Sequence, residues 1–382
     1  MGRVKGTLAA LVAAGSLIAA ATPARAAAPL RVDGARIADQ AGRTVILRGV
    51  NVNGLGDYWQ ARPEIPSTIP LTRADFDQIA SLGLNSVRLL VHWSRLEPAP
   101  GTFSDAYLAE IRQAVGWARA AGLKVVLDIH QDAWAKFVAA KPGEFCLPPF
   151  GQNVGFDGAP QWATMTDGLP NCRLVARELS PSVMRAWQSF WTNRKPQGAG
   201  PGALGIRDEF VRTWGWLAGA FRDDPTVVGY DLLNEPNWGE DYTANACGDP
   251  HNFSSPSSDL PTGLTGNVVR IRCGDAARPA GIPAGFHPDS QPALSRPYPR
   301  AYPGTAAFRA DIDARRLVVE GSASATDAPL EVWVPGSGWP DVRVQGLRIR
   351  VRIARPGGWI VRAAPLGGAY RLVATGAGPL PD

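Results

Sequence analysis

An amide and a carboxyl group, Asn234 and Glu235, stand together where an apolar segment ends. That segment, residues 226–233, is rich in β-branched residues and precedes Pro236, so it predicts a strand buried on both faces of a parallel sheet. The carboxyl ends of such strands carry the chemistry of β/α barrels and open α/β sheets. Taken alone, Glu235 fits a helix cap or a surface residue at a strand end as well as it fits a catalytic residue.

Three earlier strands are predicted to bring polar residues to the same edge. The strands are residues 48–54, 85–91 and 124–129, and amphipathic helices over residues 72–83 and 104–121 separate them. Alternating strands and helices at this spacing indicate a parallel sheet built with right-handed crossovers. The polar residues in or after these strands are Asn51 and Asn53; Arg88, His92 and Trp93; and Asp128, His130, Gln131 and Asp132.

Each of these residues has a structural alternative when it is considered singly. Arg88 fits a structural ion pair, and His130 fits a hydrogen-bonded core histidine. We assign Asp128 a structural role, because alternation along the strand places it opposite to Ile129 and towards the helices. Four successive strands that present polar groups at one edge nevertheless favour a functional site.

Several motifs resemble a known family of enzymes. GVN at 49–51, NSVRLLVHW at 85–93, VVLDIHQD at 125–132 and GYDLLNEP at 229–236 resemble the first four strands of glycoside hydrolase family 5, the cellulase superfamily of retaining β/α-barrel glycosidases. HQD at 130–132, APQWATMTDGLP at 159–170 and LSPSVMRAWQSFW at 179–191 resemble its endoglycoceramidase branch, which releases glycans from glycosphingolipids. The resemblance covers roughly residues 30 to 240.

The resemblance implies a role for each residue of the site. Retaining hydrolysis needs an acid that protonates the leaving oxygen and a second carboxylate about 5 Å away that attacks the anomeric carbon. Glu235 matches the acid/base, Asn234 the ligand of the sugar 2-hydroxyl, and Arg88 the cation that keeps the nucleophile ionised. His130, Asp132 and Asn51 match substrate-binding positions. Trp93, Trp134 and Trp162 fit either stacking on sugars or core packing, and the motifs imply no metal or cofactor.

The second half of a barrel is not recognisable in the sequence. Residues 243–303 are rich in Pro, Gly, Ser, Asp and Arg, contain no Glu, and are too short for four βα units. We therefore expect an α/β fold of the (β/α)8 TIM-barrel type that is incomplete after strand four, with the nucleophile not identified. A deletion, a shifted reading frame and a gene remnant all remain open as explanations.

Short alternating segments separated by Gly and Pro turns begin at about Thr305 and predict a small antiparallel β-sandwich. This resembles the sandwich that follows the barrel in the endoglycoceramidase branch. Glu320, in LVVEG, lies within it, so we reject it as the nucleophile; Glu331 and Glu240 are weaker candidates.

The start of the chain has the features of a secretory signal peptide: Arg3 and Lys5, an apolar stretch, and an Ala24-Arg25-Ala26 cleavage site. We expect four segments: the signal peptide (1–26), the half-barrel (27–242), an irregular or disordered segment (243–304) and the sandwich (305–382). Removing Arg3, Lys5 and Arg25 lowers the formal charge from +5 to 5 − 3 = +2 and, with no basic stripe, argues against nucleic acid as a partner.

The four cysteines of an exported chain predict disulfides, with Cys146–Cys172 preferred and Cys247–Cys273 less supported.

We expect a secreted retaining glycoside hydrolase that acts on β-glycosides of glycosphingolipids, with activity doubtful without the nucleophile strand. The alternatives are a non-catalytic glycan-binding protein or inactive remnant, and a cellulase-like endo-β-glucanase. The expected partner is a glycan or glycolipid, contact with a lipid surface is left open, and a monomer with an aggregation-prone open sheet edge is expected.

Overall fold

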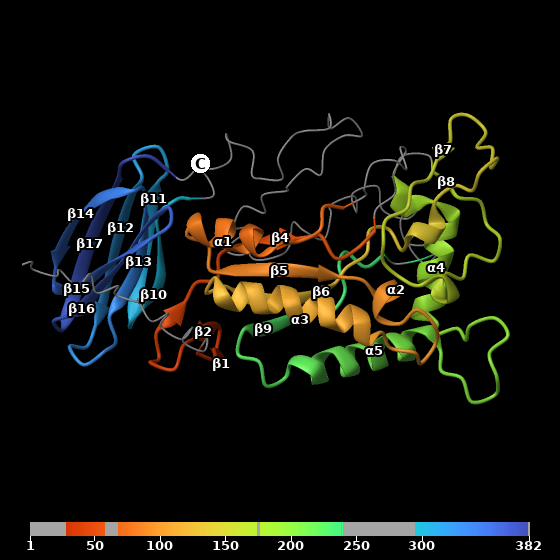
Figure 1. The fold of residues 1–382 in the computed structure, drawn as a ribbon, viewed down its shortest axis with the longest axis horizontal. Coiled ribbons are helices and arrows are strands. Elements are labelled where there is room, and N and C mark those ends of the chain that lie inside the picture. The colour runs from red at the N-terminus through yellow and green to blue at the C-terminus, as the bar shows by residue number, and fades with distance from the viewer. Residues whose placement is uncertain (1–27, 58–67, 174–175, 238, 240–294, 381–382) are drawn as a thin grey trace, which may run out of the picture.

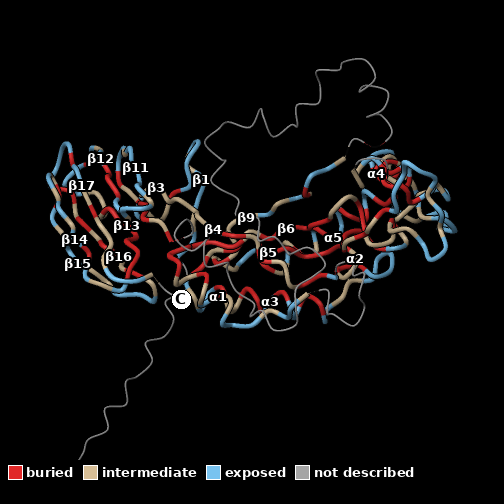
Figure 2. The backbone as a smooth tube through the Cα atoms, turned by 90° about the horizontal axis from the view of Figure 1, so that it is seen from above, coloured by how far each residue is buried: buried red, intermediate tan, exposed pale blue. Residues whose placement is uncertain are grey.

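The computed structural model describes residues 28–57, 68–173, 176–237, 239 and 295–380. The predicted signal peptide, the Cys247–Cys273 pair, Glu240 and nearly all of the segment 243–304 lie outside the described residues. Buried residues concentrate in two places, around a parallel sheet and between two C-terminal sheets (Figure 2).

The parallel sheet has the strands that the sequence predicted. Its order is β4 (Gly49–Val52), β5 (Ser86–Val91), β6 (Lys124–Ile129) and β9 (Val227–Asp231), and every neighbouring pair is parallel. The register places Asn51 opposite Arg88, and Asp128 opposite Asp231. Polar residues of all four strands therefore share one face.

Helices cover the other face of this sheet (Figure 1). They are α1 (Arg73–Ser81), α3 (Asp105–Ala120) and α5 (Ile206–Phe221), and the one-turn α2 (Trp93–Leu96) follows β5. The first turns of two of them are capped: the Thr72 amide donates to Asp75 at 2.7 Å, and the Tyr107 amide donates to Ser104 at 3.2 Å. Their apolar sides pack on alternate residues of the strands, such as Leu89 and Leu127.

The assignment of Asp128 to the helix-facing side was wrong. Ile129 and Leu127 belong to the core beneath the helices, so alternation turns Asp128 to the opposite face, where Arg88 lies. The apolar residues of β6, and not the polar one, decide which face meets the helices.

A long excursion between β6 and α5 forms the wall beside the carboxyl ends. It contains η1 (Lys136–Val138), β7 (Gly151–Gln152), η2 (Gln161–Ala163), β8 (Cys172–Arg173), η3 (Arg177–Leu179) and α4 (Pro181–Trp191). The predicted Cys146–Cys172 disulfide is present, with the two Cα atoms 5.7 Å apart. It ties the excursion to the short β7–β8 ladder.

Two antiparallel sheets, here called the C-terminal sheets, pack around a second core. One has the order β1 (Arg31–Asp33), β2 (Arg36–Ala38), β3 (Thr44–Val45), β10 (Tyr298–Tyr302), β13 (Leu330–Pro335), β16 (Gly358–Pro365) and β15 (Leu347–Arg355). The other has the order β11 (Thr305–Asp311), β12 (Arg316–Ala323), β17 (Gly368–Ala377) and β14 (Gly338–Gln345). The recruitment of β1 to β3 into the first sheet was not predicted.

The C-terminal sheets lie at the amino ends of the parallel strands, whose arrows point away from them (Figure 1). The Tyr298 hydroxyl donates to the Gly83 carbonyl at 2.8 Å, and Arg48 donates to the Arg296 carbonyl at 3.2 Å. The carboxyl ends are therefore left open at the far end of the molecule. In the described part of the chain, no helix has the length and apolarity needed to cross a membrane.

Candidate functional site

Arg88 is the centre of a cluster at the carboxyl ends of β5, β6 and β9. Its Nη2 lies 2.8 Å from Asp231 Oδ2 and 3.1 Å from Asp128 Oδ2, and it also donates to Asn234 Oδ1 at 3.1 Å. The Arg88 side chain is 24% exposed, so one side of the cluster still meets solvent. The structure thus brings together the predicted Arg88 and Asn234, and adds Asp128 and Asp231.

The buried carboxylate of Asp128 links Arg88 to His130. Its Oδ2 lies 2.7 Å from Nδ1 of His130, and the side chain is fully buried. Burial raises the pKa of Asp128, while the bonds to His130 and Arg88 act in the opposite direction. With Nδ1 directed to Asp128, the Nε2 atom of His130 remains for the site.

Asp132 stands beside His130, as the sequence predicted. Its Oδ2 lies 4.0 Å from His130 Nε2, and its Oδ1 accepts from Arg177 at 2.7 Å. The Arg177 guanidinium also lies 4.5 Å from the centroid of the Phe156 ring. Sequence reasoning missed Arg177, because it comes from η3 and no local pattern sets it apart.

Asn234 is held on both sides of its side-chain amide. Its Nδ2 donates to the Gln131 carbonyl at 3.0 Å, the Gln131 side chain donates back to the Asn234 carbonyl, and Oδ1 accepts from Arg88. These bonds tie the turn after β9 to the end of β6. An amide fixed in this way is suited to recognising a hydroxyl group.

Glu235 follows in a strained turn with its side chain exposed. Its φ of 37° lies in the left-handed region, which is uncommon for a residue other than glycine and is concentrated at functional sites. Within the described ranges, no hydrogen bond or ion pair engages its carboxyl group. Glu235 therefore presents a free carboxyl group next to the fixed Asn234.

Asn51 lies on β4 directly opposite Arg88, half-buried on the same face of the sheet. Its neighbour Asn53 has an Oδ1 atom that is buried and lacks a hydrogen bond within the described residues. All six residues singled out from the sequence, Asn51, Arg88, His130, Asp132, Asn234 and Glu235, thus lie along the face or carboxyl ends of β4, β5, β6 and β9.

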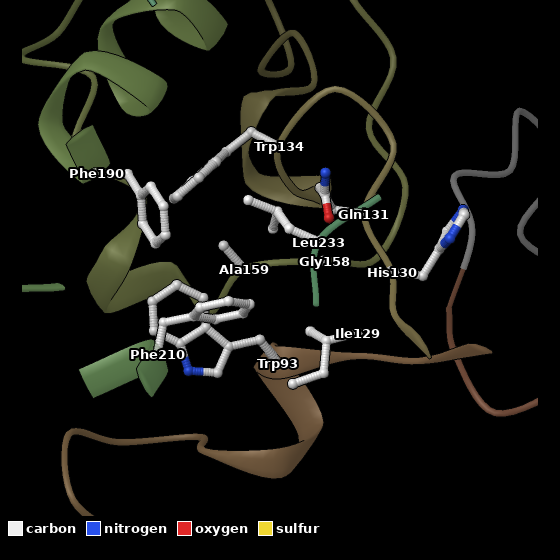
Figure 3. A pocket seen from close by; sticks show the side chains of 10 residues that line it. All are labelled: Trp93, Ile129, His130, Gln131, Trp134, Gly158, Ala159, Phe190, Phe210 and Leu233. Atoms are coloured by element: carbon white, nitrogen blue, oxygen red, sulfur yellow. The ribbon is translucent and has the colours of Figure 1, made fainter. Parts of the chain in front are cut away.

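The tryptophans beneath this rim belong to the core. Figure 3 shows Trp93, Trp134, Phe190 and Phe210 around a small apolar cavity of about 10 Å³, room for a single water, with His130 at its margin. Trp93 and Trp134 are each 2% exposed, and Trp162 donates to the Glu97 carbonyl at 3.0 Å. Core packing, and not sugar stacking, accounts for Trp93 and Trp134.

The described residues provide no carboxylate from a later barrel strand that faces Glu235. Glu320 lies on β12 and pairs with Arg371 at 3.2 Å, and Glu331 lies on β13 and pairs with Arg362 at 2.7 Å. Both belong to the antiparallel C-terminal sheets, as expected. Among the residues that the structure describes, no cluster of three or more His, Cys, Asp or Glu is suited to a metal ion.

Comparisons with known proteins point to one family. The sequence model of the cellulase family, glycosyl hydrolase family 5, matches residues 38–250. Endoglycoceramidase I of Rhodococcus hoagii is 32% identical over 217 residues, which are 56% of this chain and 38% of that protein. A glucosylceramidase of Rhizopus delemar is 28% identical over 253 residues, with 55% of this chain and 36% of that protein covered.

Comparisons with solved structures point to the same group of proteins. The crystal structure of an endogalactoceramidase is 29% identical, with a TM-score of 0.72 over 90% of this chain and 99% of that chain. Endo-glycoceramidase II from Rhodococcus sp., in its ganglioside GM3 complex, has a TM-score of 0.62 at 24% identity over 89% of this chain and 99% of that chain, and supports the fold alone. The chain spans about two fifths of the length of the two curated relatives. Because the family's sequence model covers more than half of its residues, the chain belongs to the cellulase family, glycosyl hydrolase family 5.

Proposed function

We propose that this chain carries the sugar-binding and proton-donating half of a retaining glycosidase site for β-glycosides of glycosphingolipids. The observation that carries the proposal is the free carboxyl group of Glu235 beside Asn234, whose amide is fixed by Arg88 and Gln131. The printed names of the relatives, endoglycoceramidase and glucosylceramidase, support the substrate class.

Each residue has a task in the proposed chemistry. Glu235 gives its proton to the glycosidic oxygen as the bond to the anomeric carbon breaks. Asn234 binds the sugar 2-hydroxyl, and His130 and Asp132 bind further hydroxyls. Arg88 supplies positive charge where a nucleophilic carboxylate would have to stand.

The proposal includes the organisation of the chain. We infer a β/α barrel that is incomplete after its fourth strand, followed by a β-sandwich made of the C-terminal sheets, and export by the predicted signal peptide. In this arrangement the described residues supply no nucleophile, so the proposed activity is recognition of the glycan without hydrolysis by the chain itself. Recognition without turnover is also the property that separates this proposal from a complete endoglycoceramidase.

Calorimetric titration with the free GM3 oligosaccharide, and with cellobiose, tests the recognition. We expect the GM3 oligosaccharide to bind, cellobiose to bind more weakly, and Asp132→Asn to lower the affinity about tenfold, since a charge-assisted hydrogen bond is lost. Asp77→Asn, on α1, is the matched control: the exposed Asp77 pairs with Arg73 on the same helix, so its replacement should change nothing at this site. Stronger binding of cellobiose would favour the endo-β-glucanase alternative, and no binding by a folded sample would refute the proposal.

A further inference from the structure

A second hollow lies at the other end of the molecule, on the outer face of the sheet β11-β12-β17-β14. Its volume is about 380 Å³, within the range of small-molecule sites, and its lining is polar. The residues that matter here are Arg316, Asp341, Arg343, Gln345, Arg371 and Thr375. Figure 1 shows these strands far from the carboxyl ends of the parallel sheet.

Strand register builds this hollow. Thr375 of the central strand β17 lies opposite Arg316 on one side and Asp341 on the other, and Arg371 lies opposite Glu320 and Gln345. Between these two rows, Val373 lies opposite Val318 and Arg343. Cross-strand neighbours share a face, so three arginines surround an apolar floor at Val373.

Val318 lies beside this floor, opposite Val373, and is shielded from solvent. Val318 points to the outer face of the sheet and yet is only 4% exposed. Long arginine side chains lay their methylene groups over apolar surface and keep their guanidinium groups in water. The hollow therefore combines an apolar base with charged walls.

The three guanidinium groups are not equivalent. Arg343 pairs with Asp341 at 3.1 Å and Arg371 pairs with Glu320 at 3.2 Å, whereas Arg316 has no carboxylate within 4 Å in the described part of the chain. A planar guanidinium of this kind binds a carboxylate through two parallel hydrogen bonds.

We propose that this hollow binds a sugar that carries a carboxylate, such as a sialic acid or a uronic acid. The carboxylate pairs with Arg316. Thr375, Gln345 and Asp341 hydrogen-bond the hydroxyl groups, and the C–H face of the ring rests on Val373. This site would hold an acidic glycan well away from Glu235, and it does not depend on hydrolysis.

Titration of the full chain tests the proposal, with Asn234→Ala in the background to remove binding at the first site. The probes are sialyllactose, lactose and a glucuronic-acid disaccharide. We expect binding of one or both acidic sugars, no binding of lactose, and a loss of about tenfold to hundredfold in Arg316→Gln. Binding by only one acidic probe identifies the source of the carboxylate.

Arg309→Gln is the matched control, because Arg309 lies on the same face of β11, opposite Val318, but outside the lining. It should keep the parent affinity, and thermal unfolding should show that both variants remain folded. Three results would overturn the proposal: no binding of either acidic sugar, equal affinity in Arg316→Gln, or an equal loss in both variants. Competition by acetate at the same concentration as the sugar would also overturn it, since a simple anion site is then sufficient.

Discussion

At the scale of single residues, Asp128 supports two groups of the candidate site at once. One carboxylate oxygen lies within 3.1 Å of both Arg88 and His130. Arg88 still keeps Asp231 if Asp128 is removed, whereas His130 Nδ1 has no other hydrogen bond in the described residues. The orientation of His130 therefore depends on Asp128.

Replacing Asp128 with Asn should weaken both the site and the fold. We expect the free energy of unfolding to fall by about 1–3 kcal/mol, because a buried charged hydrogen bond is lost while Arg88 keeps a second partner. Binding of the GM3 oligosaccharide should weaken about tenfold. Urea unfolding and calorimetry measure the two effects.

Asp77→Asn serves as the control for this variant too. Its ion pair with Arg73 is exposed, with the arginine side chain 66% accessible, so a loss below about 0.5 kcal/mol is expected. A similar loss in the two variants would show that burial of Asp128 has no special role.

Part of the candidate site could be predicted from the sequence. Asn234, Glu235, Arg88, His130 and Asp132 could be picked out because each lies in or just after an apolar strand. Asp231 and Arg177 could not, since their roles depend on Arg88 and Asp132, which lie far away in the chain. The face occupied by Asp128 was misassigned, because alternation gives two opposite faces but does not say which one the helices cover.

At the scale of elements, hydrophobic periodicity was sufficient for the parallel strands and their helices. It did not predict that β1 to β3 join the C-terminal sheets, because their place depends on the pairing of β3 with β10, which lies far away in the chain. The Cys146–Cys172 bridge was predictable because both cysteines fall in one loop-rich excursion between β6 and α5.

Replacing both Cys146 and Cys172 with Ser tests how much this disulfide contributes to the free energy of unfolding. The bridge spans a sequence separation of 26 residues, for which the chain-entropy model gives about 3–4 kcal/mol. We expect a loss of this size or somewhat less in urea unfolding, and earlier proteolysis between residues 140 and 173. An unchanged unfolding midpoint would show that packing alone orders the excursion.

His92, the residue after β5, makes the free energy of unfolding depend on pH. His92 is fully buried, faces Asp157, His130, Arg95 and Tyr107, and burial lowers its pKa to about 4 from the usual 6.5. The unfolded chain then binds this proton more tightly than the folded chain does. The stability that neutral His92 contributes is therefore fully present above about pH 6.5. It is lost as the pH falls towards 4, and the free energy of unfolding falls by up to about 3 kcal/mol.

Urea unfolding of the parent and of His92→Gln at pH 7, 5.5 and 4.5 measures this dependence. The difference in unfolding free energy between the two proteins should shrink or reverse as the pH falls, because only the parent carries the penalty. A constant difference over this range would contradict the assignment.

At the scale of the whole molecule, β9 forms an open edge of the parallel sheet among the described strands. This strand pairs only with β6 there; its residue Tyr230 is 38% exposed, and Leu232, which follows the strand, is 63% exposed. An open edge flanked by apolar residues promotes association.

We therefore expect the protein to be a monomer at low concentration and to associate as its concentration rises, which light scattering would detect. Leu232→Lys should reduce this association severalfold, because a charge next to the edge opposes pairing. Leu366→Lys is the control: Leu366 is 53% exposed but lies in a turn of the C-terminal sheets, so association should persist. Equal effects of the two variants would mean that charge alone, and not this edge, governs solubility.

The central claim of the proposal is that the described residues hold the acid half of a retaining site without its nucleophile. The most direct test is to incubate it with a phenyl β-lactoside, with and without azide. Azide can attack the anomeric carbon in place of a protein carboxylate, while the bond to the phenolic oxygen breaks and Glu235 protonates that oxygen. We predict no release in buffer, azide-dependent formation of the α-glycosyl azide, and loss of that reaction in Glu235→Gln; release that needs no azide, or none with it from a folded sample, would contradict the claim.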